Sequence, residues 1–133
     1  MNRRAPSRRP GTPDQSGQST VELALGLPFV VVMLLGVVQV GLVARDQILV
    51  VHAAREAARV SAVEPGDGGP RAAAVDASVL DPSRLQVDVG PRGEAGSRVA
   101  VTVRYRCPTV VPLVGSLIDD VELRATATMR VEG

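Results

Sequence analysis

An uncharged, apolar stretch at residues 23–44 constrains this chain more than any other feature of its sequence. Its 22 residues would form a helix about 33 Å long, which is enough to cross a hydrocarbon core about 30 Å thick. Gln39 is the only strongly polar side chain inside the stretch, and charged residues bound it at Glu22 and Arg45. The sequence therefore predicts a single membrane-spanning helix near the N-terminus.

The charges on the two sides of this stretch predict its orientation. Four arginines and two acids precede it, whereas arginines and acids are interleaved over residues 45–59. The positive-inside rule then places the N-terminus in the cytoplasm and the remainder of the chain outside the cytoplasmic membrane. A cleaved secretory signal is the alternative, but the apolar run is longer than a usual signal core and lacks a good cleavage site at its end.

The composition excludes several classes of function. A net charge of +1 gives no electrostatic basis for binding nucleic acid, and Phe29 and Tyr105 are the only aromatic residues available for stacking on bases. The single cysteine, Cys107, excludes an intramolecular disulfide and any multi-cysteine metal site. His52 is isolated and is expected at a surface or interface. We find no catalytic triad, metal-ligand spacing or nucleotide loop, so the sequence predicts a protein that is not an enzyme and has no cofactor.

A carboxylate, Glu22, lies at the start of the apolar run. The simplest explanation is an acid in the first turn of the helix, where it suits the helix dipole and where Ser19 or Thr20 could cap the helix. The alternative is that Glu22 serves assembly, since a charge near lipid is costly. The residues before it favour assembly, because a leader rich in Arg, Pro, Ser and Gly, expected to be disordered, occupies residues 1–17 and ends in Gly17.

This arrangement resembles the processing site of type IV prepilins and pseudopilins. Gly17 is followed by Gln18 as the first residue of a mature chain and by Glu22 as the fifth. The longer stretch GQSTVELA, together with Leu-Pro at 27–28 and Leu-Gly at 35–36, is similar to TadE-like proteins, which are minor pseudopilins of the tight-adherence (Tad/Flp) pilus systems.

The resemblance implies a function and a set of partners. A prepilin peptidase would cut after Gly17, and Glu22 would direct subunit assembly. The partners would be other pilins or pseudopilins, membrane proteins of pilus assembly and the lipid bilayer. Cutting would free an α-amine on Gln18 with a typical pKa of about 7.7–8.0, largely protonated at neutral pH. Glu22 of one subunit would pair with this amine on its neighbour, neutralising two charges that lipid penalises separately and setting the register of the packed helices.

Pro28 lies inside the predicted helix, where it removes one hydrogen bond. Two interpretations remain open: the ordinary tolerance of proline in membrane helices, or a kink that lets the helix repack as it leaves the bilayer.

The helix is predicted to continue beyond the membrane to residue 63, because residues 45–63 contain no Gly or Pro and many helix formers. We therefore expect one helix over residues 18–63, with a small-residue face formed by Val50, Ala54, Ala57 and Ser61. The segment EPGDGGP, residues 64–70, predicts a linker. A short helix is expected at residues 71–80, ending at 81–83.

Alternation of apolar and polar residues predicts antiparallel strands at 85–89, 98–107 and 121–132, with a hairpin loop at 90–97. Three strands need a cover for their apolar face, and the outer half of the long helix is the natural one. The expected fold class is therefore α+β: a long N-terminal helix packed on a small antiparallel sheet, the pilin-like plan, with residues 71–133 forming the extracytoplasmic domain. The pattern does not define the strand order.

Three further features allow two interpretations each. The apolar segment 109–118 would form a short helix or face lipid or a partner. Cys107 falls on the apolar side of its strand, which favours a buried, inert thiol over an intermolecular disulfide. The polar face of the last two strands would be solvated or would dock acidic partners; its charged residues are Arg98, Arg104, Arg106, Glu122, Arg124 and Arg130.

Two functions are consistent with these features. The first is a minor pseudopilin of a Tad/Flp-type pilus, in the cytoplasmic membrane or in the pilus. The alternative is a single-pass, membrane-anchored domain that binds a partner outside the cytoplasm and has no pilus role.

Overall fold

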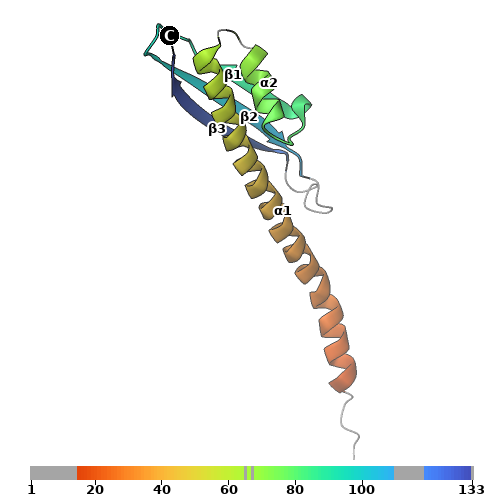
Figure 1. The fold of residues 1–133 in the computed structure, drawn as a ribbon. Helices are drawn as coiled ribbons and strands as arrows, with labels where there is room; N and C mark the ends of the chain where they lie inside the picture. The colour runs from red at the N-terminus through yellow and green to blue at the C-terminus, as the bar shows by residue number, and fades with distance from the viewer. Residues whose placement is uncertain (1–14, 65, 67, 110–118, 133) are drawn as a thin grey trace, which may run out of the picture.

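The structure, a computed structural model, describes residues 15–64, 66, 68–109 and 119–132 (Figure 1). One long helix, α1, carries a small domain of three strands and a second helix at its C-terminal end. The leader up to residue 14 and the apolar segment from residue 110 to 118 lie outside the described residues. The α+β plan predicted from the sequence, with a long helix on an antiparallel sheet, is confirmed.

Helix α1 spans Gln15–Val63 without interruption. Its 49 residues correspond to about 74 Å at a rise of about 1.5 Å per residue. The helix begins earlier than residue 18, so Ser19 and Thr20 lie inside it and the expectation that one of them caps its N-terminus is wrong. Pro28 is also inside α1, and the helix continues on both sides of it.

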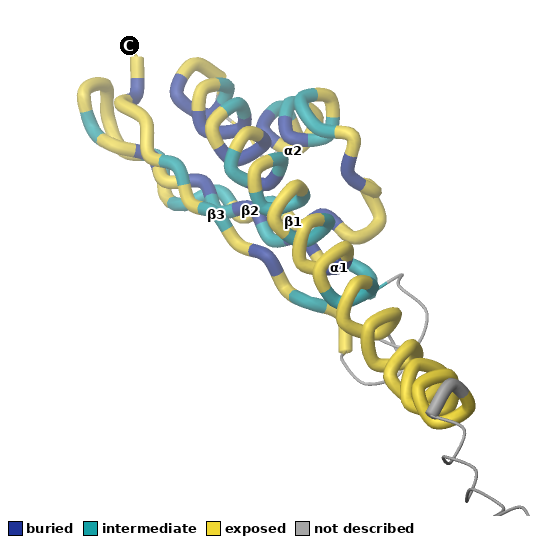
Figure 2. The backbone as a smooth tube through the Cα atoms, turned by 90° about the horizontal axis from the view of Figure 1, so that it is seen from below, coloured by how far each residue is buried: buried dark blue, intermediate teal, exposed yellow. Residues whose placement is uncertain are grey.

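The N-terminal half of α1 stands clear of the small domain (Figure 2). Its apolar side chains are exposed on all sides, with Leu23 at 70%, Phe29 at 79% and Met33 at 73% of their maximal accessible area. Its most apolar part has a mean hydropathy of 2.5 and is only 6% buried, and the helix is long enough to cross a membrane. A core helix of a soluble domain would bury these side chains, so the exposure is consistent with a membrane anchor.

The sheet consists of β1 (Leu85–Val89), β2 (Arg98–Cys107) and β3 (Val121–Arg130), paired antiparallel in the order β1-β2-β3. The three predicted strands are confirmed, except that β3 ends at residue 130 rather than 132. Because each strand pairs with the next one along the chain, the sheet is a simple meander.

The second helix, α2, spans Gly68–Asp76 and lies beside α1 (Figure 1). It begins inside the segment that the sequence predicts as a linker, and it ends four residues before the predicted end. Pro70 explains the early start, because proline is tolerated in the first turn of a helix. A single 3₁₀ turn, Pro82–Arg84, then leads into β1, and the Asp81 carboxylate caps it by accepting a 2.9 Å hydrogen bond from the Ser83 amide.

The core lies between α1 and the apolar face of the sheet. The helix contributes mainly alanines, whose small side chains let the backbone approach the strands closely. On β2 every second residue is buried, as the alternation predicts. The residues that form this core are Val50, Ala53, Ala54, Ala57, Ala58, Ala74, Leu80, Leu85, Val101, Val103, Tyr105, Cys107 and Leu123.

Met129 departs from the prediction for β3. It shares the apolar side of the strand with Leu123, but it is 38% exposed whereas Leu123 is 7% exposed. Alternation along a strand predicts which face of the sheet a side chain lies on. How far that side chain is buried depends on the position of α1 over the face. Coverage by α1 is therefore incomplete along β3.

The C-terminal end of α1 is fixed to the sheet. The Ala62 carbonyl accepts a 3.0 Å hydrogen bond from the Glu132 amide and a 3.2 Å bond from the Arg92 guanidinium. The last carbonyls of a helix have no partner within the helix, so these donors satisfy a group that would otherwise need water. These two hydrogen bonds join the C-terminal end of α1 to the small domain.

Replacing Ala57 with leucine should destabilise the small domain by about 1–3 kcal/mol, because the site is fully buried against the sheet and has no room for three more carbons. Ala72 on the exposed side of α2 is the matched control, and Ala72→Leu should change stability by about 0.5 kcal/mol or less. Chemical unfolding in detergent, followed by circular dichroism, measures both. Equal stability of the two variants would contradict the packing described here.

Candidate functional site

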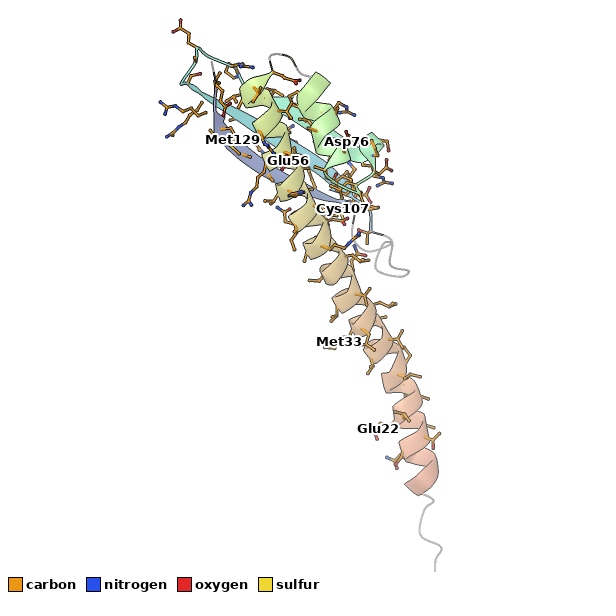
Figure 3. The ribbon with its side chains drawn as sticks, viewed as in Figure 1. Glu22, Met33, Glu56, Asp76, Cys107 and Met129 are labelled. Atoms are coloured by element: carbon orange, nitrogen blue, oxygen red, sulfur yellow. The ribbon has the colours of Figure 1, made fainter. Side chains whose placement is uncertain are left out.

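The predicted site residues lie at the end of α1 that is farthest from the small domain (Figure 3). Gln18 and Glu22 are one turn apart, so their side chains share one face of the helix. Gly17 and Pro28 fall on other sides of it. A shallow depression of about 590 Å³ lies at this end, lined by Gly17, Gln18, Val21, Glu22 and Leu25.

Glu22 is exposed, and its carboxylate has no hydrogen-bond or ion-pair partner within the part of the chain that the structure describes. In a bilayer such a group is costly unless a cation or a donor faces it. A helix with this side chain and an otherwise apolar surface can therefore gain stability by packing against a second helix that supplies the missing charge.

Gly17 lies within the first turns of α1. A Cβ built on it meets no atom within 4 Å, so neither steric crowding nor a positive φ requires glycine there. Glycine inside a helix costs about 1 kcal/mol relative to alanine. The turn around the bond between residues 17 and 18 is thus weakened. The sequence gives no sign of this property, because the predicted helix begins only at residue 18.

A second constellation lies where α1 meets the sheet, at the labelled Cys107 (Figure 3). The Cys107 thiol is free and buried, as predicted, and it donates a 3.3 Å hydrogen bond to Oδ2 of Asp46. Arg45 lies 3.6 Å from the other carboxylate oxygen of Asp46. Burial, followed by the hydrogen bond to Asp46, raises the pKa of Cys107 from its ordinary 9.0 to about 11. The thiol is therefore neutral and unreactive at physiological pH.

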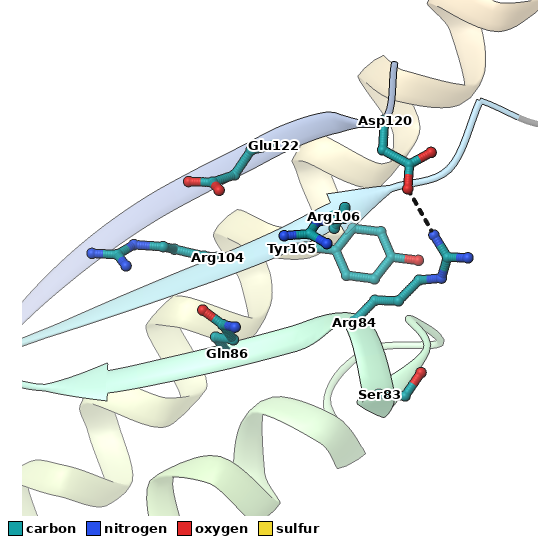
Figure 4. Close-up of a pocket in the computed structure, with 8 residues that line it drawn as sticks. All are labelled: Ser83, Arg84, Gln86, Arg104, Tyr105, Arg106, Asp120 and Glu122. Carbon is teal, nitrogen blue, oxygen red and sulfur yellow. Dashed lines mark hydrogen bonds and ion pairs between the residues drawn. The ribbon is translucent and has the colours of Figure 1, made fainter. Parts of the chain in front are cut away.

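The polar face of the sheet contains a charged depression of about 260 Å³ (Figure 4). Its charges are largely compensated. Arg84 pairs with Asp120 at 3.2 Å, and Arg104 pairs with Asp88 at 3.6 Å. Arg106 lies directly opposite Glu122 in the strand register. This balance gives the depression little preference for either an anion or a cation, so it is best understood as a solvated sheet face.

Among residues 15–64, 66, 68–109 and 119–132, no three His, Cys, Asp or Glu side chains are grouped so as to hold a metal ion. The chemistry available at the two constellations is therefore ion pairing and hydrogen bonding. The N-terminal part of α1 is the better candidate functional site, because its carboxylate is unsatisfied whereas the groups at the junction satisfy one another.

Comparison with known proteins agrees with this choice. Residues 17–59 match the family described as TadE-like protein. The match includes Gly17, Gln18, Glu22 and Pro28, and it confirms the resemblance that the sequence motif indicated over this segment. No curated protein and no solved structure matches the chain.

The raised pKa of Cys107 predicts the pH dependence of its alkylation. In the folded chain the rate of reaction with iodoacetamide should rise with a midpoint near pH 11, and in the unfolded chain near 9. Since the folded state holds the proton more tightly, stability should fall as pH increases from 9 toward 11. Asp46→Asn should lower the folded midpoint, because it removes the carboxylate charge that raises the pKa of Cys107, whereas Arg45→Gln should leave it nearly unchanged. A folded midpoint at pH 9 in the original chain would contradict the assignment.

Proposed function

We propose that this protein is a pseudopilin-like structural component of a Tad-type pilus, inserted in the membrane by α1. The function is supported most directly by two observations together: the TadE-like match at residues 17–59, and a long, lipid-compatible helix whose Glu22 has no ion-pair partner among the described residues. The TadE-like family consists of structural pilus proteins, so the match also favours a non-enzymatic role.

The proposed assembly step pairs Glu22 with the α-amine of a neighbouring subunit. Removal of the leader after Gly17 by a prepilin peptidase would create this amine on Gln18. Within one chain, the α-amine of Gln18 would lie about four residues before Glu22, or about 6 Å closer to the N-terminal end of the helix. A neighbour shifted along the axis by about one turn would bring the two charges together. The pair would remove both uncompensated charges from lipid and would define the stagger between subunits.

The position of the scissile bond supports processing at this site. The bond lies at the start of α1, in a turn weakened by glycine. Unwinding one weak terminal turn exposes the backbone to a peptidase at little cost, and it leaves the remainder of α1 intact.

The proposed topology places the N-terminus in the cytoplasm and the small domain outside. The excess of arginine before the membrane stretch supports this orientation. Pro28 is proposed as a kink that lets the helix repack during extraction from the bilayer. Because hydrogen bonds join the last turn of α1 to the sheet, the outer domain would move together with the helix.

The second candidate is a membrane-anchored domain that binds a partner and has no pilus role. One observation favours it: among the described residues, the core of the small domain forms without any contribution from Glu22. The state of the N-terminus separates the two functions, because only the first requires cleavage.

In a host with its prepilin peptidase, the intact mass of the protein should correspond to a chain that begins at Gln18. A bulky Gly17→Leu substitution should block cleavage and retain the leader, whereas Gly26→Leu, at a helical glycine with equally open surroundings, should be processed normally. Recovery of the complete leader on protein taken from assembled pili would refute the processing step.

Glu22→Ala and Glu22→Gln should insert into the membrane normally and lose co-purification with other pilus subunits, because neither variant supplies a charge for the neighbouring amine. Glu64, an exposed acid at the other end of α1, is the matched control, and Glu64→Ala should assemble normally. Quantitative pull-down from membranes, with membrane fractionation as the insertion check, measures both effects. Normal assembly by both Glu22 variants would show that the acid is incidental.

A further inference from the structure

Among the described strands, β3 lies at an edge of the sheet, and half of its backbone groups point away from the sheet. The Val131 amide donates to the Ser97 carbonyl, so Val131 and the odd-numbered residues of β3 direct their backbone groups toward β2. The even-numbered residues from 122 to 130 consequently direct theirs outward. Only the Arg124 carbonyl has a partner there within the described part of the chain, a 3.3 Å hydrogen bond from the Gln47 side chain.

The apolar side of the same strand is incompletely covered. Helix α2 lies on the β1 side of α1, and β3 lies on the other side (Figure 1). On β3 only Leu123 is buried, while Ala125 and Ala127 are half-buried and Met129 is exposed. A groove of about 460 Å³ therefore runs between α1 and β3, walled by Gln47, Val51, Ala54 and Arg55 on the helix and by residues 124–129 on the strand.

The groove carries positive charge without compensation. Arg55 lines it from α1, and Arg124 borders it from β3, where the Arg124 side chain lies on the polar face of the sheet beside the open edge; no acidic residue lines the groove. Neither guanidinium takes part in an ion pair with another described residue, in contrast to Arg84 and Arg104 on the polar face of the sheet. An open strand edge, a half-covered apolar floor and two unpaired cations thus occur together at one place.

We propose that this groove binds an extended, acid-bearing segment of a partner protein, which adds a fourth strand to the sheet along β3. Backbone hydrogen bonds to the even-numbered residues would hold the segment, as in other cases of strand addition. Its inward apolar side chains would cover Ala125, Ala127 and Met129. The carboxylates on its other face would pair with Arg124, while Arg55 adds positive charge on the side of α1.

A second copy of this chain fits the groove less well. The strands run alongside α1 (Figure 1), so antiparallel pairing of two β3 strands would point the two membrane helices in opposite directions. Parallel pairing in register would bring Arg124 against Arg124. A segment from a different protein has neither constraint, and its charge is specified by the two arginines.

The test uses the full chain in lipid nanodiscs and two short fluorescent peptides. One alternates valine with glutamate, and the other replaces every glutamate with lysine. Fluorescence anisotropy should show that the glutamate peptide binds and the lysine peptide does not. The double variant Arg55→Glu with Arg124→Glu should weaken binding of the glutamate peptide by about tenfold or more and should gain affinity for the lysine peptide. Arg98→Glu, the same change on β2 outside the groove, should have little effect.

A backbone test distinguishes strand addition from simple charge attraction. Thr126→Pro removes an outward amide and no amide that pairs with β2, so the sheet should survive while peptide binding is lost. Hydrogen exchange should show slower exchange at Thr126 and Thr128 when the glutamate peptide is bound to the original chain. The proposal is overturned by absence of binding of the glutamate peptide, by equal binding of both peptides, by indifference to the arginine reversal, or by protection elsewhere. Concentration-dependent dimerisation through β3 without peptide would instead identify a second copy as the occupant.

Discussion

One helix has to satisfy two different surroundings, and the remainder of the structure depends on how its sequence changes along its length. From Leu23 to Val38, α1 is apolar on every side and largely exposed, which suits lipid and leaves no face for a protein core. The change begins at Gln39, which is buried, and at Val43, which packs against the core. Beyond that point, alanines concentrate on one side, and those at 53, 54, 57 and 58 are almost completely buried against the sheet. The absence of bulk on this face lets a three-stranded sheet, marginal on its own, gain a close-packed cover.

The transition between these two parts is marked by a compact polar contact. Asp46 lies two residues beyond the apolar stretch and accepts a hydrogen bond from the thiol of Cys107 at the end of β2. Together with the bonds to the Ala62 carbonyl, this contact ties both ends of the packed half of α1 to the sheet. In the proposed function, these contacts would transmit any movement of the membrane part of α1 to the outer domain. The pairing that drives assembly would take place at Glu22, at the other end of the helix.

The sequence predicts the regular parts of this fold well. The strand at 85–89 has the predicted limits, because period-two alternation depends on local burial alone. The long helix was predicted from its composition, but its start was not, since a leader rich in Ser and Gly gives no helical signal at Gln15. Contacts that join distant residues are invisible in local patterns: Asp46 and Cys107 are 61 positions apart, and neither has a motif around it. The groove beside β3 was missed for the same reason, because Met129 alternates as a core residue does and only the position of α1 leaves it exposed.

The central claim is that the acid at Glu22 meets a newly exposed amine on a neighbouring subunit. Zero-length carbodiimide coupling of assembled protein, followed by peptide mass spectrometry, tests it most directly, because this reagent joins only amines and carboxylates that are in contact. We expect an amide bond between Glu22 and the N-terminal amine of another subunit, and its loss in Glu22→Gln. Assembled protein in which Glu22 is never coupled, or in which the neighbouring N-terminus still carries its leader, would contradict this account.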